Sequence, residues 1–338
     1  MDLQIEFTPW GKETLKTVLI VYFYTMKPLL FISFFTILSF LAKAQDAKPT
    51  YNTTTDEDIE NQIKIGFVRL QKMSKIPDQV LKGKNIQALN ISVSDSIKSI
   101  PATIVNLQSL WMLAIANTSI STVPKEVGSL KNLRGLYLSG NYVTRLPKEI
   151  GNLAHLKTLH LRHMYLLDLP VEIGQLQLLE DLDLTGNRAP NRAQRAGFTP
   201  PLKGLELPST IGNLINLKEL NFSYNVAKVV PSSIGKLQNL TKLYLNDNNL
   251  KTLPKEMGQL VHVKTLFLNN NFLQEIPAEI ANMTDLEILH LEHNKLTHLP
   301  EGLSGLTKLR GLWLEDNKIP VEEILKLKQK LPQTKFFY

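Results

Sequence analysis

The chain has 338 residues, of which 43% are hydrophobic and 20% are charged, with 38 Lys and Arg against 31 Asp and Glu. This apolar content is enough for a core, and the charge is too low for a disordered chain. The sequence contains no cysteine, which excludes disulfides, cysteine-ligated metal clusters, thiol nucleophiles and lipid attachment to an N-terminal cysteine.

Residues 1–44 read as a leader that differs from the rest of the chain. A basic segment begins at Met26-Lys27, an apolar run follows from Leu29 to Leu41, and Ala42-Lys43-Ala44 has the small-x-small pattern of a cleavage site. This order is typical of a secretory signal peptide, and we expect cleavage after Ala44 and export to the periplasm or the cell exterior. One hypothesis is that translation starts at Met26. The alternative is an uncleaved leader that anchors the protein in a membrane, although Lys27 would then lie inside the bilayer.

Residues 45–85 are predicted to form an N-terminal cap. Thr54 and Glu57 have the spacing of a capping box, and Ile59, Ile63, Phe67 and Leu70 lie on one face of the expected helix. A half-repeat at Ile76-Pro77 would join this helix to the first full repeat.

Residues 86–318 contain ten copies of a repeat. An apolar residue followed by proline recurs every 23 residues, as at Val123-Pro124 and Leu146-Pro147, and Leu-x-x-Leu-x-Leu-x-x-Asn lies between these prolines. One interval is 15 residues longer, which predicts an irregular insertion within 188–206. A fixed period of this length is the signature of a solenoid.

The pattern resembles the leucine-rich repeat proteins, and Leu-Pro-x-x-Ile-Gly-x-Leu at 146–153 is similar to their Ras-group subclass. The resemblance implies an α/β solenoid with a curved parallel sheet on its concave face and short helices or turns on its convex face. We expect ten strands, with Pro147 at the first position of a return helix and Gly151 at its end. Extracellular animal members usually carry Cys-rich caps, so the absence of cysteine together with the leader favours a bacterial exported protein.

The asparagine that closes each repeat is predicted to be structural. Its amide can bond main-chain groups that the turn leaves unpaired, which would otherwise cost about 1–3 kcal/mol each. This ladder comprises Asn141, Asn187, Asn225, Asn248, Asn271, Asn294 and Asn317. Met164 replaces the asparagine in the fourth copy, and we expect an altered turn there. Residues 319–338 are predicted to form a C-terminal cap of one helix and a last strand.

No pattern in the sequence indicates catalysis. A phosphate-binding loop is missing, the glycines recur with the repeat period, and about 20 residues remain after the last repeat. Bacterial leucine-rich repeat ubiquitin ligases need a catalytic cysteine, which this chain lacks. The pair His290 and Glu292 is better explained as a chance surface pair than as a metal site. We therefore predict a non-enzymatic protein without catalytic residues, cofactor or metal.

The outward-facing strand positions are the candidate binding site. The leucines that alternate with them point into the core, whereas these side chains face outward. The partner-binding residues predicted on the concave face are Tyr137, His160, Asp183, Asn221, Tyr244, Phe267, His290, Glu292, Trp313 and Glu315. Aromatic residues anchor many interfaces, although such rings also stabilise neighbouring strands.

Charge separates the possible partners. Seven acids and two bases lie at outward positions, and the remaining bases fall on other surfaces. Nucleic acid needs a continuous basic track, so we expect no nucleic-acid partner. Arg188, Arg192 and Arg195 in the insertion form either a solvated loop or a lip for an acidic partner. We predict that the chain binds a protein; the alternatives are a glycan or cell-surface polymer, and an intracellular signalling scaffold of the Ras-group type.

Overall fold

The computed structural model describes residues 55–187 and 204–338. The predicted leader with its cleavage site at Ala44, and the insertion arginines 188, 192 and 195, lie outside the described residues. The repeats and both caps belong to one compact unit, Thr53–Tyr338.

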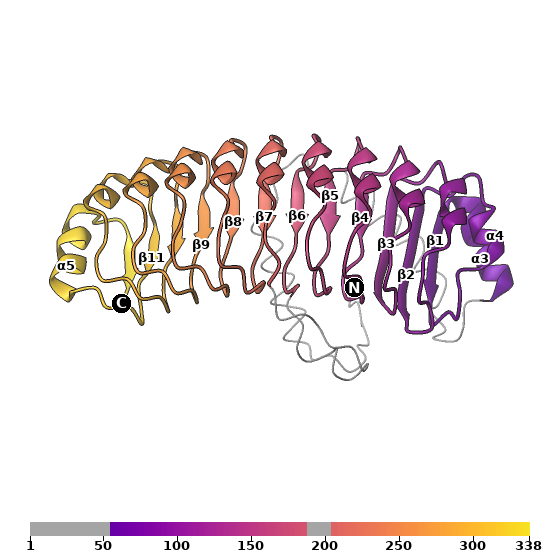
Figure 1. Cartoon of the computed structure of the whole chain (residues 1–338), viewed down its shortest axis with the longest axis horizontal. Helices are drawn as coiled ribbons and strands as arrows, with labels where there is room; N and C mark the ends of the chain where they lie inside the picture. The colour runs from indigo at the N-terminus through magenta and orange to yellow at the C-terminus, as the bar shows by residue number, and fades with distance from the viewer. Residues whose placement is uncertain (1–54, 188–203) are drawn as a thin grey trace, which may run out of the picture. The chain divides into compact units, whose positions relative to one another are not determined.

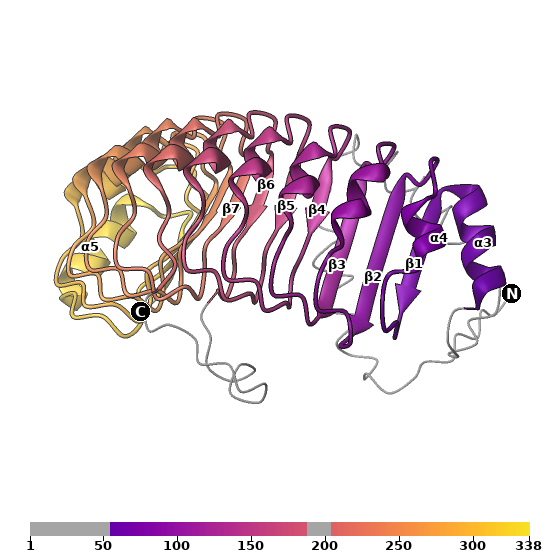
Figure 2. The same ribbon diagram turned by 45° about the vertical axis from the view of Figure 1, so that its right-hand side comes forward.

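Twelve parallel strands of this unit form one open sheet in chain order, in a row along the curved solenoid (Figures 1 and 2). The strands are β1 (Phe67–Gln71), β2 (Ala88–Ser94), β3 (Met112–Thr118), β4 (Gly135–Tyr137), β5 (Thr158–His160), β6 (Asp181–Asp183), β7 (Glu219–Asn221), β8 (Lys242–Tyr244), β9 (Thr265–Phe267), β10 (Ile288–His290), β11 (Gly311–Trp313) and β12 (Lys335–Phe337). The α/β solenoid fold predicted from the repeats is therefore confirmed, but the expected number of ten strands is wrong because each cap contributes one strand.

The return path of the repeats consists of 3₁₀ helices, which form a row along the upper side of Figure 1. They are η1 (Ala102–Asn106), η2 (Lys125–Ser129), η3 (Lys148–Asn152), η4 (Val171–Gln175), η6 (Ser209–Asn213), η7 (Ser232–Lys236), η8 (Lys255–Gln259), η9 (Ala278–Asn282) and η10 (Glu301–Gly305). Pro147 is the N-cap of η3 and not its first residue, with ψ of 145°. Fixed φ and the absent N–H suit proline to this extended position before the turn.

Gly151 has a different role from the one predicted. It lies inside η3, which ends at Asn152, and its backbone does not adopt the left-handed conformation. A Cβ at this position would lie 2.6 Å from the carbonyl oxygen of Glu172 in the next repeat. Glycine is therefore required because neighbouring 3₁₀ helices approach each other closely, and not because the helix ends there.

The helix of the N-terminal cap begins one residue later than predicted, and a strand follows it. Helix α3 (Asp56–Ile65) has its capping box between Thr55 and Asp58, not between Thr54 and Glu57, and it ends at Gly66 with φ of 79°. Phe67 and Leu70 consequently lie in β1 and not on the helix. A short helix α4 (Asp78–Leu81) then leads into the first repeat.

The C-terminal cap contains the predicted helix and the predicted last strand. Helix α5 (Val321–Lys330) buries Ile324 and Leu327, and β12 pairs with β11 in parallel. Leu331 at the end of the helix is 3% exposed, so this cap covers the apolar end of the last repeat.

The closing asparagines bond the backbone of two successive repeats. Nδ2 of Asn248 donates to the carbonyl oxygens of Phe222, at 2.8 Å, and Leu245, at 3.1 Å, while its Oδ1 accepts from the N–H of Ala227 at 3.0 Å. The turn at Met164 keeps the usual backbone conformation, contrary to expectation, because the preceding His163 has φ of 51°, as Asp247 before Asn248 has φ of 56°. Met164 itself is buried.

Candidate functional site: the outward face of the sheet

The outward residues predicted from the repeats align in one central column. Strand register places them side by side in the order Arg69, Asn90, Ala114, Tyr137, His160, Asp183, Asn221, Tyr244, Phe267, His290, Trp313 and Phe337. Arg69 and Phe337 could not be placed from the repeats because they belong to the caps. For Phe337 a signal was present, since the last strand was expected, but its distance from Trp313 departs from the 23-residue period.

Five rings of this column form a continuous stack. Ring centroids are 5.1 Å apart for Tyr244 and Phe267, 4.2 Å for Phe267 and His290, 3.9 Å for His290 and Trp313, and 4.7 Å for Trp313 and Phe337. The interplanar angles are between 8° and 24°. These rings therefore cover one another's faces and direct their edges away from the sheet. We call these five residues the ring stack.

Small residues make room for the rings. Gly311 precedes Trp313 by one outward position, and a Cβ there would lie 2.5 Å from the indole. Gly135 has the same relation to Tyr137, where the Cβ would approach the ring to 2.8 Å. Tyr137 lies outside the ring stack and meets His160 edge-on, at 5.1 Å and 89°.

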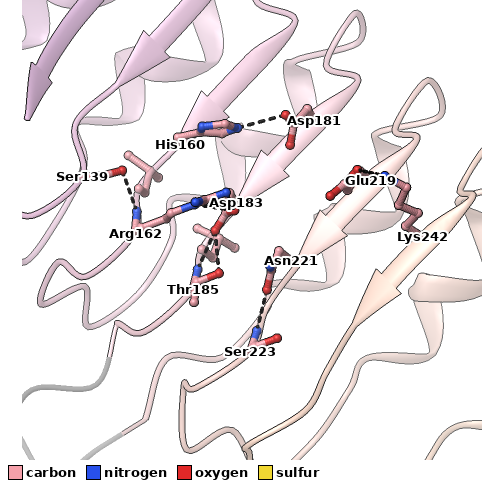
Figure 3. Close-up of polar contacts among 12 residues, drawn as sticks. Ser139, His160, Arg162, Asp181, Asp183, Thr185, Glu219, Asn221, Ser223 and Lys242 are labelled. Atoms are coloured by element: carbon pink, nitrogen blue, oxygen red, sulfur yellow. Dashed lines mark hydrogen bonds and ion pairs between the residues drawn. The ribbon is translucent and has the colours of Figure 1, made fainter. Parts of the chain in front are cut away.

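The middle of the sheet face is polar and internally paired (Figure 3). His160 Nε2 lies 2.9 Å from Asp181 Oδ2, and Arg162 Nε donates to Asp183 Oδ2 at 2.6 Å. Asp183 is only 3% exposed, and its other oxygen accepts from the backbone N–H and the hydroxyl of Thr185. Asp183, one of the residues predicted to bind a partner, thus already has hydrogen-bond partners for both oxygens within the chain.

A second pair lies beside Tyr244. Lys242 Nζ donates to Glu219 Oε2 at 2.9 Å. Burial acts to lower the pKa of Lys242, but the hydrogen bond and the charge of Glu219 outweigh it and hold that pKa above its usual value. Burial, assisted by the charge of Glu219, raises the pKa of the Tyr244 phenol.

Most outward acids have a hydrogen-bond or ion-pair partner within the chain. Oε1 of Glu292 accepts from His290 Nδ1 at 3.0 Å, and Oδ2 of Asp316 lies 2.7 Å from His293 Nδ1. Glu315 differs, because its Oε2 is buried and has no hydrogen-bond partner among the described residues. Sequence spacing could not show which acid would remain unpaired.

The bases at the start of the strands bridge successive repeats. Lys157 and Lys218 both donate to Glu180, at 2.8 and 2.5 Å, and these hydrogen bonds lower the pKa of that carboxyl. Lys264 and Arg310 form longer ion pairs with Glu287, at 3.5 and 3.6 Å. These side chains therefore form ion-pair ladders on an edge of the sheet that the ring stack does not reach.

Neither a metal site nor a membrane span is found in the described ranges 55–187 and 204–338. These ranges contain no cluster of three or more His, Cys, Asp or Glu side chains that could hold a metal ion. Within them, no helix has the length and apolar character needed to cross a membrane.

Comparisons with known proteins agree with the fold. Sequence models described as leucine rich repeat match residues 132–153, 239–260 and 261–319. A comparison with curated proteins gives no match. Among solved structures, the plant peptide hormone receptor RGFR1, solved in complex with RGF2, is 28% identical at a TM-score of 0.64 over 78% of this chain. This chain spans 41% of that receptor's length.

Two bacterial structures are also similar. An internalin (inlF) of Listeria monocytogenes is 19% identical at a TM-score of 0.61, over 88% of this chain and 85% of its own. A leucine-rich repeat protein of Leptospira interrogans is 25% identical, over 85% of this chain and 93% of its own, at a TM-score of 0.45. With the 23-residue period, the parallel sheet and the matching sequence models together, the chain is a leucine-rich repeat protein.

Proposed function

We propose that the chain is a non-enzymatic recognition protein that binds another protein through the concave face of its sheet. The observation that carries this proposal is the ring stack, whose side chains lie outside the leucine core and remain partly exposed. Aromatic side chains are enriched among the residues that dominate binding energy at interfaces. The similarity to RGFR1, a receptor solved with the hormone RGF2, supports a polypeptide ligand.

The geometry favours a protein over a glycan. Sugars bind aromatic residues by laying their C–H groups against a ring face. In the ring stack the faces of Phe267, His290 and Trp313 are covered on both sides by neighbouring rings. Edges suit the small apolar side chains of a polypeptide better than they suit a pyranose.

Residues 1–44 support export, so we place the protein outside the cytoplasm in this proposal. N-terminal sequencing of protein recovered from the medium or periplasm tests this part. A mature N-terminus at Gln45 is expected, and a start upstream of Gln45 contradicts cleavage.

The binding proposal is tested by paired variants of the full chain. Phe267→Ala with Trp313→Ala removes two of the three inner rings of the stack, whereas Val171→Ala with Ile215→Ala removes exposed apolar side chains in η4 and just after η6. A partner captured by cross-linking from cell-surface proteins should lose at least about tenfold in affinity for the first pair and keep its affinity for the second. Equal affinity of the partner for the unchanged chain and for both double variants would refute binding by the concave face.

A further inference from the structure

We propose that the ring stack and Glu315 together bind a polypeptide segment that carries an apolar side chain close to a lysine or arginine. This inference rests on the proposed function and deepens it by naming the chemistry of the partner. It is carried by three observations: the orientation of the rings, the unpaired Oε2 of Glu315, and the row of acceptors in which Glu315 lies.

The rings offer a narrow apolar ridge. Because their faces cover one another, each ring presents an edge to solvent, and the ridge spans five strands from Tyr244 to Phe337. Inner ring faces are not accessible to a cation, so the usual approach of an ammonium group over a ring is closed along the ridge. Between the end rings Tyr244 and Phe337, a cationic side chain must therefore find its partner beside the stack.

Among the described residues, Glu315 is the acid beside the stack that has an unpaired, buried oxygen. It follows Trp313 by one outward position, and its Oε2 is buried without a hydrogen bond within the described chain. The neighbouring Glu292 is different because both of its oxygens lie within 3.2 Å of His290 Nδ1. Burying a carboxylate oxygen without a donor is unfavourable, and rotation of the Glu315 carboxylate toward a cation on the open face would remove that cost.

The outward position two residues after a ring supplies a second acceptor, near Glu315. Oδ1 of Asn269, two strands from Glu315, is also buried without a partner among the described residues. Glu292 lies between them, so acceptors dominate this side of the ring stack. Two strand spacings are about 9.6 Å, which three residues of an extended peptide span. Lysine and arginine carry a positive charge and only donate hydrogen bonds, so they fit the column of Asn269, Glu292 and Glu315 best.

The opposite flank of the stack has a different character. The outward positions before the rings are Lys242, Thr265, Ile288, Gly311 and Lys335, and the two lysines are the charged members of this set. Charge complementarity therefore orients the bound segment, with its base over Glu315 and its apolar side chain across the ridge.

The test starts from a random peptide library displayed on phage and selected on the immobilised full chain. Selected peptides are synthesised, and their affinity is measured by calorimetry. We expect enrichment of peptides in which Lys or Arg lies within about three residues of an apolar side chain. Replacing that base by Gln in the peptide should weaken binding about tenfold, and this comparison needs no change in the protein.

A double-mutant cycle then locates the base. Glu315→Gln should weaken the parent peptide about tenfold but leave the Gln-substituted peptide unaffected. Glu301→Gln, at an exposed acid in η10, is the matched control and should change neither affinity.

The outcomes separate this inference from the proposed function. Peptides that lose affinity with Phe267→Ala and Trp313→Ala but not with Glu315→Gln overturn the inference and keep concave-face binding. Peptides insensitive to all these variants overturn both. Selection of peptides without bases, or of none above the bare surface, also overturns the inference.

Discussion

The close approach of neighbouring 3₁₀ helices predicts that Gly151→Ala destabilises the solenoid. The added Cβ would lie 2.6 Å from the carbonyl oxygen of Glu172 and 2.8 Å from Oε1 of Gln175. Ordinary contacts of a Cβ begin near 3.4 Å, and the carbonyl belongs to the backbone of the next repeat. The substitution therefore has to separate two packed repeats.

Two effects of opposite sign decide how much Gly151→Ala changes the free energy of unfolding. Alanine restricts the unfolded chain and would stabilise the protein by about 0.4–1 kcal/mol if the site were open. Overpacking costs about 1–3 kcal/mol. The second effect is larger here because the nearest obstacle is backbone, so we expect a net loss of about 1–2 kcal/mol.

Urea unfolding followed by far-UV circular dichroism measures this difference, with Gly305→Ala as the control. Gly305 also lies in a 3₁₀ helix, but nothing lies within 4 Å of a Cβ placed there. The midpoint should fall for Gly151→Ala and stay or rise for Gly305→Ala. Equal midpoints would refute the packing argument.

The contact between η9 and η10 has different residues at the same two positions and provides a second test. Ala281 occupies the position of Gly151 in η9, and the next repeat has Gly302 where Glu172 would lie. A Cβ on Gly302 would lie 2.8 Å from the Cβ of Ala281. Gly302→Ala should therefore be destabilising alone and be rescued by Ala281→Gly, whereas additive effects would contradict direct contact.

Three further predictions concern other parts of the fold. Asn248→Ala removes hydrogen bonds to two repeats and should cost at least about 2 kcal/mol of unfolding free energy, and a loss below about 1 kcal/mol in urea unfolding would contradict the ladder. Phe267→Ala should lower the free energy of unfolding by about 1–3 kcal/mol, because Phe267 stacks on both Tyr244 and His290 and each stacked pair contributes about 0.5–1.5 kcal/mol. In thermal melts, the control Phe272→Ala, at an exposed turn, should cost less. Hydrogen bonds from Lys308, then from His262, lower the pKa of Asp285 to about 2, so this group stabilises the fold above pH 3.8 and its contribution is lost as pH falls toward 2. Carboxyl NMR titration should show that pKa, and Lys308→Met should raise it.

The repeat period by itself determined the fold and the outward column. Leucines at alternate positions can bury only one face of a strand, and a 23-residue interval, lengthened once by the 15-residue insertion, places most repeat strands in the same register as their neighbours. Tyr244, Phe267 and Trp313 could therefore be assigned to one surface from the sequence alone. The caps were predicted less well, because α3, β1 and β12 do not follow the period.

Only the tertiary structure decided how the side chains of that column interact. Ring planes, ion pairs and the close contact at Gly151 depend on distances between repeats, which a one-dimensional period does not contain. A count of outward acids could not reveal that Asp183 is satisfied by Arg162 while Glu315 is left with an unpaired oxygen. The sequence thus determined which residues share a surface, and the packing of adjacent strands about 4.8 Å apart decided which of them remain free to bind.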